Sequence, residues 1–405
     1  MSESTTHQDL LVIGGGLVGA AVAAACAGRG LSIAVIEARP PVRNGPADHG
    51  DPRVCALNRA SQRILSRLGV WGRITELGVS PYRRMEVWDA IGGGRIQFDS
   101  ADLGEPDLGH IVENRILQSA LWERLEHCPE VTLIAPARIM DLTLGAESAL
   151  VTLHDGRQIA ARLVVGADGR DSRVREFAGI GTRGWDYDQR AIVTTARTEW
   201  PHAETAWQRF LPTGPVAFLP LADGRCSIVW SAVEGYAQTL LALSDEAFCE
   251  ALGEAIEHRL GRILAVGPRT AFALRLQHAT NYCQPRLALV GDAAHAVHPL
   301  AGQGLNLGLL DAAELAAAID RAIDRGRDIG SFATLRRYER ARRGDNWVML
   351  LAFDGLKRLF GNDQAWLAFA RSLGLGLTDR LGPVKNHLGA TALGIRGALP
   401  PLARP

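Results

Sequence analysis

The sequence predicts an α/β fold, with a Rossmann-like dinucleotide-binding domain, an interleaved β-sheet domain and C-terminal helices. Three observations predict it. A strand, a glycine-rich loop, a helix and a second strand open the chain; two further apolar strands end at aspartate-containing turns far downstream; and short alternating segments lie between them. The length of 405 residues and the hydrophobic content of 47% allow two packed domains, or one large α/β unit, with a proper core.

The opening unit is a β-α-β arrangement. The apolar run at 10–13 predicts a strand, and the pattern G-x-G-x-x-G follows it directly. An alanine-rich stretch then predicts a helix to about residue 29, and the apolar run at 32–36 predicts the second strand. The glycine pattern therefore has the strand before it and the helix after it that a dinucleotide site requires.

Three glycines and an acidic strand end supply the expected contacts of this site. Gly14 permits the tight turn, Gly16 lets the backbone approach a pyrophosphate, and Gly19 lets the helix lie close to the strand. The helix N-terminus faces the phosphates. Glu37, at the end of the second strand, is placed to accept hydrogen bonds from a ribose diol, although a solvated strand end is the alternative.

Two later strands also end at turns that contain an aspartate. One apolar strand runs into Asp168 and Gly169, and another, far downstream, runs into Gly291 and Asp292. Each aspartate alone could simply form a turn. A simple NAD dehydrogenase has no need of both turns, so together with the glycine loop they indicate a different nucleotide cofactor.

The remaining predicted elements are further strands, most of them in a second sheet, and two long helices. The strand-like segments are 84–90, 95–99, 162–166, 191–198, 206–211, 216–221, 226–232 and 286–290, and the helices are 244–258 and 332–360. The dinucleotide-binding domain is expected to be discontinuous (1–80, 101–182 and 271–330), with a substrate-binding β-sheet domain at 81–100 and 183–270 and a helical region at 331–405.

Composition excludes several kinds of partner and site. The 44 basic residues balance the 44 acidic ones, so charge gives no argument for nucleic acid as a partner. The six cysteines include no C-x-x-C pair, which indicates a reducing compartment and no structural zinc. The N-terminus lacks the basic region of a signal peptide, and no apolar stretch approaches the ~18 residues that span a bilayer. A cytoplasmic protein is therefore expected.

Longer stretches carry a family resemblance that covers nearly the whole chain. The segments "DPRVCALNRAS" (51–61), "HPLAGQGLNLGLLD" (298–311) and "YERARRGDN" (338–346) are similar to those of the FAD-dependent hydroxylases of ubiquinone biosynthesis. These enzymes are aromatic-ring flavoprotein monooxygenases with a p-hydroxybenzoate hydroxylase-like fold. Within the family, the chain resembles the bacterial members that act on demethoxyubiquinol or on 2-polyprenylphenol.

The resemblance implies the cofactor, the co-substrates and the reaction. FAD is the expected cofactor, O2 a co-substrate and NAD(P)H the electron donor. The implied reaction hydroxylates the aromatic ring of a polyprenylated phenol or quinol through a flavin C4a-hydroperoxide. Because the cofactor carries out this chemistry, we assign no acid/base catalytic residue and no metal.

The resemblance also assigns cofactor contacts. It places Arg53 at the isoalloxazine ring, Arg115 at a phosphate or ribose, Asp168 near FAD and the nicotinamide donor, and Asp292 at the ribityl or ribose region. A solvated surface arginine is the alternative for both Arg53 and Arg115. The complete set of expected cofactor-binding residues is Gly14, Gly16, Gly19, Glu37, Arg53, Arg115, Asp168, Gly169, Gly291, Asp292, Pro299, Gly302, Gln303, Gly304, Leu305 and Asn306.

The glycine-rich helix start at 302–304 is expected at the pyrimidine edge of the flavin. Its free N–H groups and positive dipole end can stabilise negative charge on reduced flavin. Pro299 fixes the loop before this helix, and Asn306 is placed for either a capping bond or a flavin contact. His295 and His298 lack further ligands at metal-binding spacing, so we favour a structural hydrogen-bonding role for both over acid/base catalysis.

Three alternative functions share parts of this pattern. A soluble phenol hydroxylase of aromatic catabolism would have the same FAD motifs, and a non-catalytic FAD-binding scaffold in a biosynthetic complex would keep them for folding. An FAD-dependent halogenase needs a catalytic lysine near the flavin. The only lysines, Lys357 and Lys385, lie in the C-terminal region, which argues against a halogenase.

The C-terminal stretch 346–395 is rich in Trp, Phe and Leu with interspersed Lys and Arg. A polyprenylated substrate is insoluble in water. This composition therefore fits a peripheral contact with the inner face of the cytoplasmic membrane, or a contact within a ubiquinone-biosynthesis complex. A helix packed on the FAD-binding domain is the alternative.

Overall fold

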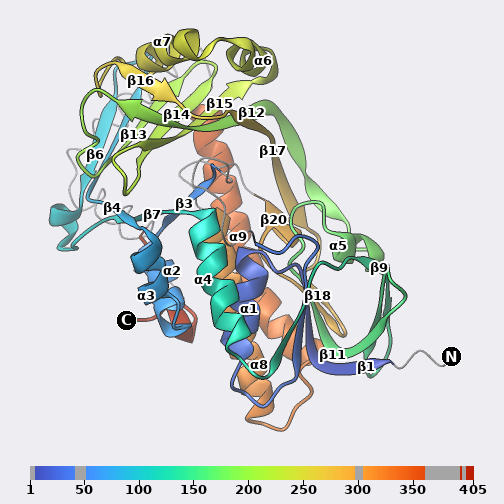
Figure 1. Ribbon diagram of the computed structural model, residues 1–405. Coiled ribbons are helices and arrows are strands. Elements are labelled where there is room, and N and C mark those ends of the chain that lie inside the picture. Colours follow the sequence, from blue (N-terminus) through green and yellow to red (C-terminus); the bar gives the residue numbers. More distant parts are fainter. Residues whose placement is uncertain (1–4, 42–51, 297–303, 361–392, 395–397) are drawn as a thin grey trace.

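The computed structural model describes residues 5–41, 52–296, 304–360, 393–394 and 398–405. In this part of the chain, an eight-stranded sheet, a nine-stranded sheet and a three-stranded sheet are connected and covered by helices (Figure 1). The predicted fold class, α/β with an interleaved sheet and C-terminal helices, is confirmed.

The eight-stranded sheet is the Rossmann-like layer. Its order is β18-β19-β11-β1-β2-β8, with β10 paired to β11 and β9 to β10. Its strands are β1 (Thr6–Ile13), β2 (Ile33–Ile36), β8 (Val131–Ile134), β9 (Ile139–Leu144), β10 (Ala149–Leu153), β11 (Gln158–Gly166), β18 (Cys283–Gln284) and β19 (Leu287–Leu289). β1, β11 and β19 run parallel. Since the carboxyl ends of parallel strands meet at one edge, the three predicted turns follow at that same edge.

The nine-stranded sheet forms the upper layer in Figure 1, with α6 and α7 covering its outer face. Its order is β20-β17-β12-β15-β14-β13-β5-β6, with β16 paired to β12. Its strands are β5 (Arg84–Asp89), β6 (Arg95–Asp99), β12 (Thr182–Thr198), β13 (Thr205–Leu211), β14 (Gly214–Pro220), β15 (Cys226–Val233), β16 (Ile263–Val266), β17 (Thr270–Ala279) and β20 (His295–Ala296). The small sheet contains β3 (Val54–Leu57), β4 (Ser80–Tyr82) and β7 (Gly109–Glu113).

The helices surround the Rossmann-like sheet and cap the outer layer. The α-helices are α1 (Leu17–Cys26), α2 (Arg59–Arg67), α3 (Trp71–Leu77), α4 (Asn114–Glu126), α5 (Arg173–Phe177), α6 (Glu234–Ala242), α7 (Asp245–Ala255), α8 (Gly304–Ile323) and α9 (Phe332–Phe360). Short 3-10 turns are η2 (Ser100–Leu103), η3 (Gly291–Ala293) and η5 (Pro401–Ala403). Within the described residues, no helix is long and apolar enough to cross a membrane.

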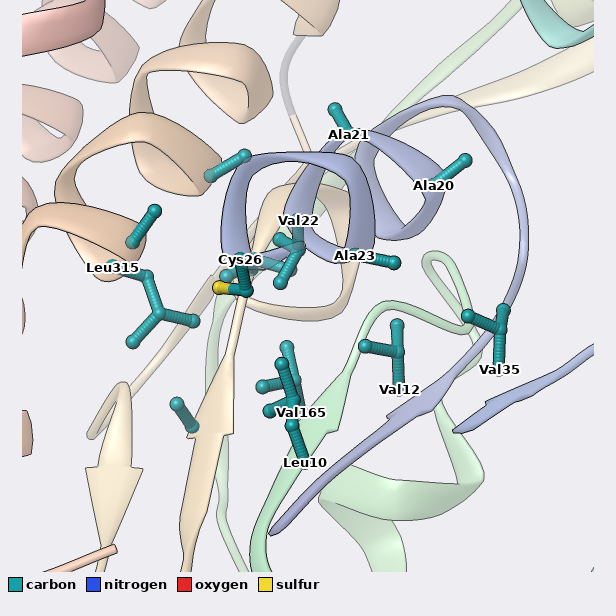
Figure 2. Packing of buried hydrophobic residues seen from close by; sticks show 14 of the residues in the cluster. Leu10, Val12, Ala20, Ala21, Val22, Ala23, Cys26, Val35, Val165 and Leu315 are labelled. Carbon is teal, nitrogen blue, oxygen red and sulfur yellow. The ribbon is translucent and has the colours of Figure 1, made fainter. Parts of the chain in front are cut away.

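Close packing of α1 on the sheet fixes the glycine loop. Val22 and Ala23 of α1 are buried over Val12 and Val165 of the sheet, and Leu315 of α8 lies beside Cys26 at the end of α1 (Figure 2). The alanine-rich sequence keeps α1 thin enough for this approach, and burial of the apolar side chains stabilises it.

Helix α1 is shorter than the sequence predicted. It ends at Cys26 rather than near residue 29, because Ala27 is extended (φ −64°, ψ 150°). Gly28 and Gly30 follow with φ of +75° and +70°, a region that glycine adopts without steric cost. The chain therefore turns early toward β2.

Helix α9 connects the two large sheets. The Tyr338 hydroxyl donates to the Leu289 carbonyl of β19 at 2.7 Å. Further along the helix, Leu350 is buried against Leu276 of β17. In Figure 1 this helix extends from beside α8 up to the nine-stranded sheet. One helix thus contacts both layers between which a cofactor is expected.

Candidate functional site

Two of the three glycines after β1 are required by the fold, because a side chain there would collide with the backbone. Gly14 has φ +101°, and a Cβ there would lie 2.3 Å from the Ala167 carbonyl oxygen, at the end of β11. A Cβ at Gly19 would lie 1.9 Å from the Gly14 carbonyl oxygen. The tight turn and the close helix approach that the sequence predicted are both present.

Gly16 is different, because neither its backbone nor its neighbours exclude a side chain. It precedes α1 with φ −67°, and a Cβ built on it meets no atom within 4 Å. The space in front of Gly16 and the first turn of α1 is therefore open. Exposed helix N–H groups beside an open space suit the pyrophosphate of a dinucleotide, so the residues fit FAD at this position.

The side chain of Glu37 holds the glycine loop. Its carboxylate accepts the Gly15 N–H at 2.7 Å and the Arg39 N–H at 2.8 Å. The Gly15 carbonyl in turn accepts the indole N–H of Trp122 at 2.7 Å. Each oxygen of Glu37 keeps acceptor capacity for a ribose hydroxyl. Trp122, on α4, had no predicted role, since the sequence gives no sign of this contact.

Asp168 and Gly169 form the second turn. The Asp168 carboxylate accepts the Ser172 hydroxyl at 2.5 Å and the Val174 N–H at 3.1 Å, at the start of α5. Desolvation raises its pKa, although these hydrogen bonds oppose the rise. Gly169 has φ +85°, in the left-handed region. The Asp168 side chain is thus directed to its own turn, as in the alternative interpretation of a turn-forming aspartate.

The third turn, Gly291 and Asp292, packs on the first helix. Gly291 has φ +56°, and a Cβ there would lie 3.1 Å from the Val18 side chain of α1. A Cβ at Gly308 of α8 would lie 2.6 Å from the same side chain. Gly291 and Gly308 therefore let the turn and α8 approach Val18 closely. The sequence pattern drew attention to Gly291 but not to Gly308.

Arg175 joins the second turn to the third. Its guanidinium donates to the Arg170 carbonyl at 2.8 Å and to the Ala293 carbonyl at 2.9 Å. Together with the Gly14–Ala167 and Gly291–Val18 approaches, this contact links the three turns in pairs. The structure therefore brings the three predicted turns together.

Asp292 combines a side chain that solvent can reach with a desolvated carboxyl group. Its side chain is accessible to solvent. Its pKa is nevertheless raised by desolvation, because surrounding protein displaces most of the water near it. The charges of His295, Arg170 and Arg53 oppose this rise of the pKa. An accessible carboxylate suits contact with a polar ligand.

The two predicted arginines lie in different surroundings. Arg53 is exposed, and its guanidinium carbon lies 5.3 Å from the ring centre of Phe272 on β17. Its carbonyl accepts the Asn114 N–H at 3.0 Å, which fixes the backbone beside α4. Arg115 forms a two-point ion pair with Glu113 at 2.7 and 3.0 Å. Proximity to Asp292 thus favours Arg53 over Arg115 as a ligand contact.

The start of α8 is described from Gly304 onward. Gly304 and Leu305 are partly buried in its first turn. Asn306 is buried, and its amide accepts the Asn58 N–H at 3.1 Å and donates to the Ala56 carbonyl at 2.8 Å. The side chain therefore anchors the β3–α2 connection. The predictions for Pro299, Gly302, Gln303 and His298 lie outside the described residues.

His295 is a buried hydrogen-bonding residue. It is 1% exposed, and its Nε2 lies 2.5 Å from Oδ2 of Asp311 on α8. This contact agrees with a structural role for His295. In the described part of the chain, no group of three or more His, Cys, Asp or Glu side chains could hold a metal ion.

Known proteins are similar to this chain over almost its whole length. A family model described as "FAD binding domain" matches residues 7–350. Ubiquinone hydroxylase UbiL of Rhodospirillum rubrum is 43% identical over 388 residues, which are 95% of this chain and 89% of that protein. The 3-demethoxyubiquinol 3-hydroxylase of Escherichia coli is 38% identical over 389 residues, which cover 96% of this chain and 98% of that protein.

A solved structure shares the fold. The p-nitrophenol 4-monooxygenase PnpA of Pseudomonas putida superposes with a TM-score of 0.81, and the match covers 98% of this chain and 100% of that chain. Its sequence identity is 19%, so this likeness establishes the architecture alone.

Proposed function

Because the chain belongs to the FAD-dependent hydroxylases of ubiquinone biosynthesis, we propose that it hydroxylates the aromatic ring of a polyprenylated phenol or quinol on that pathway. Bound FAD would, once reduced, activate O2, and one oxygen atom of O2 would be transferred to the ring. The residues of the chain bind and orient the cofactor and keep water away from it. No residue is assigned as a general acid or base.

The observation that carries this proposal is the meeting of the three turns in front of Gly16. The fold itself does not require a glycine at position 16. Gly16 has an ordinary backbone conformation, and a Cβ built on it would meet no atom within 4 Å. The pyrophosphate would lie there, against the N–H groups at the start of α1. Glu37, at the end of the adjacent strand, would accept the hydroxyls of a ribose.

The third turn and the start of α8 would hold the rest of the flavin. Asp292 would accept hydroxyl groups of the ribityl or ribose region, and Arg53 would lie at the isoalloxazine ring. Gly304 and Leu305 would present the first N–H groups of α8 to the pyrimidine edge, where they stabilise negative charge. Pro299, Gly302 and Gln303 belong to the same proposed contact.

The second turn and two side chains would complete the cofactor contacts. Asp168 and Gly169 would lie between FAD and a nicotinamide donor, NADH or NADPH. Arg115 would contact a phosphate or ribose. Asn306 would act indirectly, through its bonds to the β3–α2 connection.

The proposed division of labour follows the two large sheets. Segments 1–80, 101–182 and 271–330 would bind FAD, and 81–100 and 183–270 would bind the ring substrate. Every strand of the Rossmann-like sheet lies in the first set. Strands β17 and β20 from 271–330 pair in the nine-stranded sheet, so this segment contributes to both layers.

An insoluble substrate would be met at the inner face of the cytoplasmic membrane or within a biosynthetic complex. Val348 and Leu351 on α9 are large apolar side chains exposed to 65% and 44%. Such side chains favour a lipid surface. Replacing both by Ser should weaken sedimentation with vesicles of anionic phospholipid, and unchanged sedimentation would contradict a membrane contact through α9.

The reaction is tested by quinone profiling. Deleting the gene should lower ubiquinone and accumulate an intermediate that lacks one ring oxygen, as measured by mass spectrometry. The wild-type gene should restore ubiquinone, whereas a gene carrying Asp292→Ala should not. An unchanged ubiquinone pool in a strain without a redundant hydroxylase would refute the proposed reaction.

A further inference from the structure

One buried carboxylate joins the third turn to the C-terminal helix. Oδ2 of Asp311, on α8, accepts the Gly291 N–H at 3.1 Å and lies 2.5 Å from Nε2 of His295. Oδ1 accepts Nε–H of Arg342 at 2.9 Å and Nδ2–H of Asn346 at 3.0 Å, both from α9. Asp311 is fully buried. One oxygen thus faces the turn and the other faces α9.

The two contacts of Oδ2 lie on either side of Asp292. Gly291 immediately precedes Asp292, and His295 follows three residues later. Nδ1 of His295 has no hydrogen-bond partner among the described residues, so the Asp311 contact is the polar anchor of that ring. A displacement of Asp311 would therefore displace the turn that carries Asp292.

The contacts of Oδ1 fix the position of the carboxylate. Burial alone would raise the pKa of Asp311, but His295 and Arg342 lower it to about 2. Burial disfavours the charged Arg342, but Asp311 raises its pKa. The Arg342 guanidinium also donates to the side-chain Oδ1 of Asn346 at 2.6 Å. Since both charges are buried, separating the two groups would leave each charge less well compensated.

Close packing against α1 restricts where the third turn can lie. Gly291 and Gly308 both lie against Val18, and neither leaves room for a Cβ without a shift. The turn therefore cannot move toward α1 to compensate for a displaced Asp311. Its location depends on the carboxylate and, through it, on α9.

We propose that Asp311 is a positioning residue for the flavin: it sets where the Asp292 carboxylate lies, and it thereby makes Arg342 of α9 part of the FAD site. This inference goes beyond the proposed reaction, because it concerns FAD affinity alone. An enzyme that binds FAD normally but does not hydroxylate the predicted ring would refute the proposed function without touching this inference.

The direct test is Asp311→Asn. An amide offers an acceptor on one side and N–H groups on the other, so it would face either the Gly291 N–H or Arg342 with a donor. We expect the dissociation constant for FAD, measured by fluorescence titration of the apoprotein, to rise by about tenfold or more. Asp320→Asn is the matched control, since Asp320 lies on the same helix but pairs with Arg29 at 3.0 Å. Its FAD affinity should equal that of the wild type.

A double variant distinguishes the positioning of Asp292 by Asp311 from a general destabilisation of the protein. If Asp311 acts through Asp292, adding Asp311→Asn to Asp292→Ala should weaken FAD binding by less than about twofold further. Two independent losses that multiply in the double variant would overturn the inference. So would wild-type FAD affinity in Asp311→Asn.

Arg342→Lys provides a milder variant if Asp311→Asn does not fold. Lysine keeps the charge but cannot reproduce the forked contacts to Asp311 and Asn346. FAD affinity should fall several-fold, with the thermal midpoint of the apoprotein little changed. Arg340→Lys, at an exposed position two residues before Arg342 on α9, is the control. Wild-type affinity in Arg342→Lys would overturn the inference.

Discussion

The carboxylate of Glu37 accepts the N–H of Gly15 at 2.7 Å, and this bond joins the end of β2 to the glycine loop after β1. The same carboxylate accepts the Arg39 N–H at 2.8 Å. The residue expected to bind a ribose therefore also shapes the loop expected to bind the pyrophosphate. Each of these contacts uses one of the two carboxylate oxygens as acceptor.

Glu37→Gln should weaken FAD binding about tenfold, because an amide can accept only one of the two N–H groups and would face the other with a donor. FAD titration of the apoprotein measures this loss. Glu76→Gln, in an exposed residue that pairs with Arg73, is the control and should bind FAD as the wild type does. Equal affinity in Glu37→Gln would show that the carboxylate is not needed.

Replacing Gly16 and Gly19 separately should give opposite results. Gly16→Ala should change the unfolding free energy of the apoprotein by less than about 1 kcal/mol, since its Cβ meets nothing, but FAD binding should be strongly weakened. Gly19→Ala should destabilise the apoprotein by about 1–3 kcal/mol, because its Cβ collides with the Gly14 carbonyl. Urea unfolding and FAD titration of both variants check this; normal FAD affinity in Gly16→Ala would refute the pyrophosphate position.

His278 should make the protein less stable in mild acid. Burial, helped by nearby His295 and Arg343, lowers the pKa of His278 to about 4, whereas Asp311 opposes this shift. Below about pH 6.5 the unfolded chain therefore gains a proton that the native protein does not, and native stability falls as the pH falls toward 4. The expected loss between about pH 7 and about pH 5 is roughly 2 kcal/mol.

The variant His278→Gln isolates this effect. Glutamine can still accept the Tyr282 hydroxyl, which lies 3.1 Å from Nε2 of His278, but it does not titrate. Urea unfolding at the two pH values should show a smaller loss for the variant than for the wild type. The same loss in both proteins would contradict the role of His278.

Local sequence patterns predicted the elements whose own apolar periodicity marks a buried face. The strand at 10–13, the hairpin around β5 and β6 and the long helix from 332 to 360 are present, because their apolar periodicity matches the faces that they bury. Strand β12 was predicted only from 191, although it begins at Thr182. Its first residues are polar or aromatic, and they form a strand because they pair with β17.

The site contacts that the sequence did not predict join residues far apart in the chain. Arg175 and Ala293 are 118 positions apart, and Asp311 and Arg342 are 31 apart. Nothing in the neighbouring sequence of either arginine indicates its partner. The sequence identified the turns, because each follows an apolar strand, but the side chains that hold them together depend on tertiary packing.

The flavin content of purified Asp292→Ala tests the account most directly, because Asp292 is the accessible carboxylate at the meeting of the three turns. Asp324→Ala, at an exposed position after α8, is the control. The wild type and the control should purify yellow with one FAD per chain, measured by visible absorbance. Asp292→Ala should be colourless or flavin-poor while remaining folded; full yellow occupancy in this variant would contradict the assignment of the site.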